Sequence, residues 1–154
     1  MKRGNKGLGC LVLIAIALAI YVGGRGKTPG AATIDEYAAI VQSGLAIAAG
    51  GRDVRDVRVI NNEASTGERI VMISYITTER TDAGLVDEYL DVLEAAAQTI
   101  HARSLNLNVI TLAIGAPNGD ALGAVVANYD DVYAWTRGEL TRGELLMRLS
   151  VTGF

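Results

Sequence analysis

The chain has 154 residues, a net charge of −3, one cysteine (Cys10) and one histidine (His101). A single cysteine excludes an intrachain disulfide, and together these two residues cannot supply the three or four nitrogen and sulfur ligands of a zinc site. Five of the 14 basic residues lie in the first 27 positions. The rest of the chain contains the other nine basic residues, all Arg, and all 17 acidic residues, so its net charge is −8. That charge repels phosphate backbones and argues against nucleic acid as a partner.

The N-terminal stretch has the pattern of a membrane segment. Residues 1–7 form a basic leader, and residues 8–22 are apolar apart from Gly9. A helix from Gly7 to Gly24 would be about 27 Å long, close to the hydrocarbon thickness of about 30 Å. We predict a single-pass anchor; a cleaved secretory signal, which would release the domain as a secreted protein, is the alternative. The basic residues before the apolar stretch favour a cytoplasmic N-terminus and a domain outside the membrane.

A Gly-rich tether, residues 23–32, precedes a small α+β domain, residues 33–154. Thr33 and Glu36 predict a capping box for a first helix, which we expect Gly50 and Gly51 to end. The alternating Arg and Asp residues of 52–58 are typical of a solvated sheet edge with ion pairs. We expect the first strand at residues 57–61 and the second at 69–78.

A long helix is predicted from a cap at Thr81 or Asp82 to about Arg103. The third and fourth strands are expected at residues 105–116 and 121–128, separated by a tight turn at residues 117–120. The tail, residues 130–154, is predicted to hold two short helices. The first runs over residues 130–137, and the second opens at a capping box on Thr141 and reaches about Leu149.

The helix–strand–strand order of residues 33–78 recurs in residues 82–128, at an offset of about 52 positions. Asp35-Glu36-Tyr37 then aligns with Asp87-Glu88-Tyr89, although chance matching is the alternative to a duplication. The order αββαββ is that of a permuted ferredoxin-like two-layer sandwich. It predicts a four-stranded antiparallel sheet with the second and fourth strands central, both long helices on one face, and a C-terminal helical tail.

The second and third predicted strands are apolar on both faces, which is expected when both faces are covered. We expect the tail to fold across the face that the two long helices leave open. Apolar area that remains there would be a partner surface, for which the candidate residues are Ile70, Met72, Ile76 and Trp135.

Carboxylates are the abundant reactive groups. Asp87, Asp91 and Glu94 share one face of the long helix, so they are candidates for binding a metal ion or a basic partner; a solubilising surface is the alternative. His101 falls near the end of the same helix, where a structural or solvated role is expected rather than catalysis. No cofactor is expected.

The sequence therefore favours a membrane-anchored, extracytoplasmic, non-catalytic binding or assembly module whose partner is another protein or a second copy of the chain. The alternative is a membrane-tethered hydrolase that depends on carboxylates. A pocket with converging carboxylates would favour the hydrolase, whereas an exposed apolar surface would favour the module.

Overall fold

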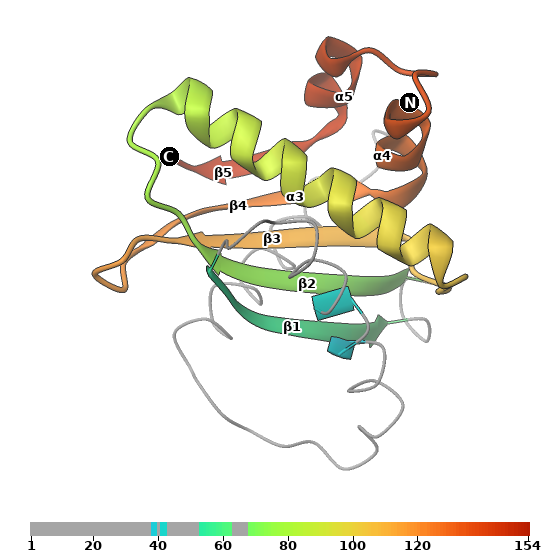
Figure 1. Cartoon of the computed structure of the whole chain (residues 1–154), viewed down its shortest axis with the longest axis horizontal. Helices are drawn as coiled ribbons and strands as arrows, with labels where there is room; N and C mark the ends of the chain where they lie inside the picture. Colours follow the sequence, from blue (N-terminus) through green and yellow to red (C-terminus); the bar gives the residue numbers. More distant parts are fainter. Residues whose placement is uncertain (1–37, 40, 43–52, 63–67) are drawn as a thin grey trace, which may run out of the picture.

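The computed structural model describes residues 38–39, 41–42, 53–62 and 68–154. In chain order its elements are β1 (Asp53–Asn62), β2 (Glu68–Ile76), α3 (Asp82–Ala102), β3 (Val109–Gly115), β4 (Ala121–Asn128), α4 (Tyr129–Thr136), α5 (Arg142–Arg148) and β5 (Ser150–Gly153) (Figure 1). The predicted leader, anchor, tether and first capping box lie outside the described residues. No helix in the described part is long and apolar enough to cross a bilayer.

The α+β class is confirmed, but the predicted sheet is wrong. The described strands form one five-stranded sheet in the order β1-β2-β3-β4-β5, and β2 pairs with β3 in parallel while the other neighbours are antiparallel. β2 and β4 are therefore not adjacent, and β3 is central rather than at an edge. The physical reason is α3, which crosses one face of the sheet and returns the chain to start β3 beside β2 in the same direction.

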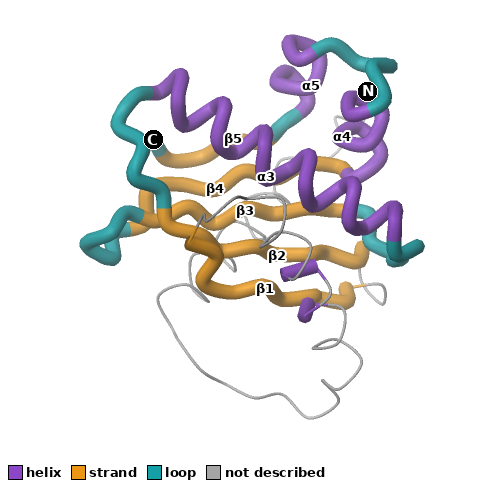
Figure 2. The backbone as a smooth tube through the Cα atoms, in the orientation of Figure 1, coloured by secondary structure: helices purple, strands orange, loops and turns teal. Residues whose placement is uncertain are grey.

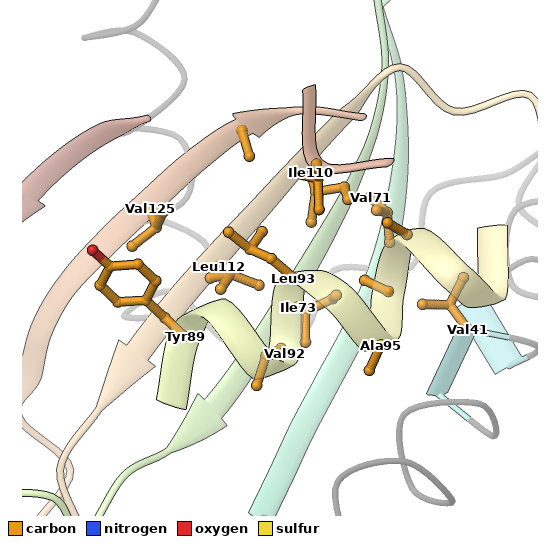
Figure 3. Close-up of a cluster of buried hydrophobic side chains, with 14 of the residues drawn as sticks. Val41, Val71, Ile73, Tyr89, Val92, Leu93, Ala95, Ile110, Leu112 and Val125 are labelled. Atoms are coloured by element: carbon orange, nitrogen blue, oxygen red, sulfur yellow. The ribbon is translucent and has the colours of Figure 1, made fainter. Parts of the chain in front are cut away.

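The long helix follows its sequence signals closely. The Thr81 side chain caps α3 by accepting a hydrogen bond of 3.1 Å from the Gly84 N–H. The helix buries one apolar stripe, and in Figure 3 Leu93 lies against Leu112 of β3 and Ile73 of β2. Burying a Leu or Ile side chain stabilises the fold by about 1.5–3 kcal/mol, so this stripe is a main source of stability.

The turn between β3 and β4 also agrees with the prediction. The Gly119 N–H donates to the Ala116 carbonyl at 3.0 Å, and Gly119 has a positive φ of 93°. That conformation favours glycine because a side chain there is strained. β4 then runs over the predicted residues 121–128.

The prediction that the tail crosses the face opposite the long helix is wrong. Val132 of α4 and Leu145 of α5 are fully buried in the cluster that also contains Leu93 of α3 and Val125 of β4. Both short helices therefore pack on the face that α3 covers (Figure 2). The cause is local: Asn128, the last residue of β4, is the N-cap of α4, so the chain turns straight from the strand into the helix.

β5 was not predicted. After α5 the chain becomes extended at Leu149, and Ser150–Gly153 pairs antiparallel with β4, with Val151 opposite Val125. The tail therefore contributes two helices to the core and one strand to the edge of the sheet.

Candidate functional site

The acidic residues of α3 are not gathered into a metal site. Asp87 forms an ion pair with Arg142 of α5, and Glu94 accepts a hydrogen bond of 3.0 Å from the Gln98 side chain. Within the ranges that the structure describes, no three His, Cys, Asp or Glu residues are placed to hold a metal ion. The basic group that pairs with Asp87 is therefore Arg142 of the chain's own tail. Binding of a cation or a basic partner by Asp91 and Glu94 stays a prediction.

His101 lies in a small aromatic cluster at the end of α3. Its ring stacks on Tyr133 of α4 with 4.2 Å between ring centroids, and Tyr129 stacks on Tyr133 at 5.7 Å. The Arg137 guanidinium lies 4.7 Å from the Tyr133 ring centroid. Burial raises the pKa of Tyr129, and neighbouring Tyr133 and Asp130 raise it further. The contacts of His101 hold α3 against α4, which is a structural use of the ring.

The four predicted partner-binding residues are not strongly exposed. Ile70 and Met72 are only 1% and 2% exposed, and Ile76 and Trp135 are half-buried. Trp135 packs against the main core, while Ile70 and Met72 point to the face opposite α3. Their role in partner binding stays a prediction.

The exposed large apolar side chains of the described residues occur at the other end of the tail. Met147 of α5 is 81% exposed, Val151 of β5 is 44% exposed and Phe154 is 54% exposed. All three fall within eight positions of the chain, in or next to a strand that pairs on one side only among the described strands. We call β5 with Met147 and Phe154 the β5 edge.

Two features hold the β5 edge in place. Leu145 is fully buried and fastens α5 to the core. The start of α5 is a complete capping box, in which the Thr141 N–H donates to the Glu144 carboxylate at 2.8 Å and the Glu144 N–H donates to the Thr141 hydroxyl at 3.3 Å. Hydrogen bonds from the Thr141 backbone and side chain lower the pKa of Glu144.

Close packing against β4 sets the position of the strand. A Cβ atom on Gly123 would lie 2.5 Å from the Thr152 carbonyl oxygen and 2.7 Å from the Phe154 ring, both nearer than real Cβ contacts come. Gly123 is therefore required by the close approach of β5 and Phe154.

The hydrogen-bond pattern shows which backbone groups of β5 face outward. The Phe154 N–H donates to the Leu122 carbonyl at 3.0 Å, so residues 154 and 122 are a hydrogen-bonded pair of the antiparallel ladder. Hydrogen-bonded pairs alternate with open ones along such a ladder. The N–H and C=O groups of Val151 and Gly153 therefore point away from β4, toward the free side of the strand.

Sequence reasoning missed this edge because four residues are too few to show a periodic pattern. The available signal was Ser150-Val151-Thr152, a short run with β-branched residues directly after a predicted helix end. No family model matches the chain, and no curated protein and no solved structure matches it.

Proposed function

We propose that the protein is a membrane-anchored, extracytoplasmic, non-catalytic binding and assembly module that takes a protein partner along its β5 edge. The observation that supports the proposal is that Met147, Val151 and Phe154, all exposed, lie within eight positions of the chain, in or next to an edge strand of the described sheet with outward backbone groups. A sheet edge binds an extended segment by main-chain hydrogen bonds, and neighbouring apolar side chains add affinity and selectivity.

The anchor and the charge support the same role. Residues 8–22 would hold the domain at a membrane, with the Gly-rich residues 23–32 as a flexible link to the sheet. The chain beyond position 27 carries −8, which disfavours nucleic acid and the surface of anionic lipids as partners. A protein partner is therefore the favoured class.

The carboxylate-dependent hydrolase would need two carboxylates that converge on a substrate. Among the candidate carboxylates of α3, Asp87 is paired with Arg142. No specific contact of the described residues favours the hydrolase, so the binding module is the function that we put forward.

The proposal is tested by replacing Met147 or Phe154 of the full-length protein with a photo-crosslinking amino acid and irradiating intact membranes. The matched control carries the same amino acid at Asn118, an exposed position in the turn between β3 and β4. We expect a discrete adduct of defined mass from Met147 and Phe154, recovered in alkali-washed membranes, and none from Asn118. If neither position gives an adduct above the Asn118 control, the β5 edge is not a binding surface.

A further inference from the structure

We infer that the partner at the β5 edge is a second copy of this chain, whose β5 pairs antiparallel with the first about a two-fold axis. The inference rests on the proposed function, because it names the partner of that same edge. The product would be one continuous ten-stranded sheet across both copies, with the helices of both copies on the same face.

The outward backbone groups select the register. Val151 and Gly153 are the β5 residues whose N–H and C=O groups point away from β4. If Thr152 lies opposite Thr152 of the second copy, Val151 of each copy faces Gly153 of the other. In this register each of the two residue pairs exchanges main-chain hydrogen bonds. Gly153 has a positive φ of 84°, so it departs from regular strand geometry and pairs at the irregular end of the strand.

The side chain at the centre of this register fits the pairing. Thr152 Oγ1 is buried and has no hydrogen-bond partner among the described residues. In the proposed register the two Thr152 residues form an open pair, in which opposite Cβ atoms are about 4.5–5.5 Å apart and Thr–Thr pairs hydrogen-bond across the strands. A rotation about χ1 would bring each hydroxyl toward its copy, which gives this orphaned group a partner.

Charge also favours a second copy at β5 rather than at the other edge. Residues 150–154 carry no charged side chain, so two copies meet there without repulsion between identical groups. β1, by contrast, carries Asp53, Arg55, Asp56 and Arg58, and a β-bulge interrupts its register between Val54 and Asp56. Charges and bulges are the devices by which natural edge strands avoid pairing with each other.

The proposed membrane anchor would allow two copies to associate through so short an interface. Four residues of strand provide few contacts, which is too little for a tight complex between freely diffusing proteins. Two copies anchored in one membrane by residues 8–22 remain close together, and tethering of this kind raises the effective concentration of the second binding event.

The experiment uses the full-length chain in native membranes with Cys10→Ser and Thr152→Cys. Cβ atoms at an open antiparallel pair approach the separation that a disulfide needs, about 3.5–4.5 Å. Mild oxidation should therefore give a covalent dimer on a non-reducing gel. The control pairs Cys10→Ser with Arg55→Cys, which places an exposed thiol on the β1 edge.

A second variant separates pairing from folding. Val151→Pro in the Thr152→Cys chain removes an outward N–H that β4 does not use, so the sheet should survive while the dimer yield falls at least tenfold. A Thr152→Cys yield no higher than that of Arg55→Cys would overturn the second copy as partner. If a photo-adduct from Met147 then has a mass other than twice that of the chain, the β5 edge still binds a different protein. If there is no photo-adduct either, the proposed function fails as well.

Discussion

The two edges of the sheet differ in length and chemistry. β1 has ten residues, and its Asp and Arg side chains form ion pairs along the strand, Arg55 with Asp53 and Arg58 with Asp56. β5 has four residues and no charged side chain, with the exposed Val151 within it and the exposed Phe154 directly after it. A long edge without protection is a template for aggregation, and charge on the edge prevents it. From this comparison we expect β1 to resist pairing with other chains, and we propose that β5, which is short and uncharged, accepts it.

The ion pairs of β1 add little to stability. Each pairs two partly exposed side chains, and exposed pairs of this kind contribute about 0–1 kcal/mol. We expect these ion pairs to act on whether another strand can pair with β1 rather than on the free energy of unfolding. The stability of the β5 edge, in turn, depends on buried contacts such as Leu145 and on close packing at Gly123.

The largest expected effect comes from displacing β5. Gly123→Ala places a methyl group against the Thr152 carbonyl and the Phe154 ring, so β5 must shift away from β4. Overpacking of this kind costs about 1–3 kcal/mol of unfolding free energy. Thermal melting of the full-length protein in detergent should show the loss, and hydrogen exchange at the Phe154 amide should accelerate.

The matched control is Gly143→Ala in α5, where a Cβ atom meets nothing within 4 Å. Alanine favours a helix over glycine by up to about 1 kcal/mol, so this variant should melt at or above the wild-type temperature. A Gly123→Ala protein that melts and exchanges like the wild type would show that β5 is not held closely against β4.

An intermediate effect is expected from opening the closed edge. Asp53→Ser, Arg55→Thr, Asp56→Ser and Arg58→Thr together remove both ion pairs of β1 and leave an uncharged strand. Because the protection is lost while the buried Val57 and Val59 remain, the fold should persist and new association should appear through β1. Sedimentation in detergent should detect species larger than the wild type forms. An unchanged mass distribution would mean that the charges are not what closes this edge.

The smallest effect concerns the cap that positions α5 before β5. The hydrogen bonds from Thr141 lower the pKa of Glu144 from its usual 4.5, so the cap stabilises the fold when this carboxylate is ionised. That contribution is complete above the usual pKa and is lost as pH falls through the lowered value. Glu144→Ala should therefore reduce the melting temperature slightly at pH 7, and the difference from the wild type should vanish in strong acid. A difference that stays constant with pH would assign the effect to something other than the carboxylate.

The features that could be predicted from the sequence are those that depend on neighbours along the chain. The cap of α3, expected at Thr81 or Asp82 and found at Thr81, was predicted, as were the cap at Thr141, the turn at Gly119 and the bounds of β4. A cap or a turn is made by hydrogen bonds and φ preferences within a few residues. The charged edge of β1 was predicted for the same reason, since its ion pairs join residues two positions apart.

Tertiary structure alone decided the strand order, the face that the tail covers and the candidate site. The two apolar faces of β2 and β3 fit several strand orders, and only the path of α3 makes them parallel neighbours. Asp87 pairs with Arg142, which lies 55 positions further along the sequence, so a local sequence pattern could not predict this ion pair. β5 is a strand because it pairs with the edge of β4, and Gly123 allows the close approach. A segment of four residues is too short to be a stable strand without such a neighbour.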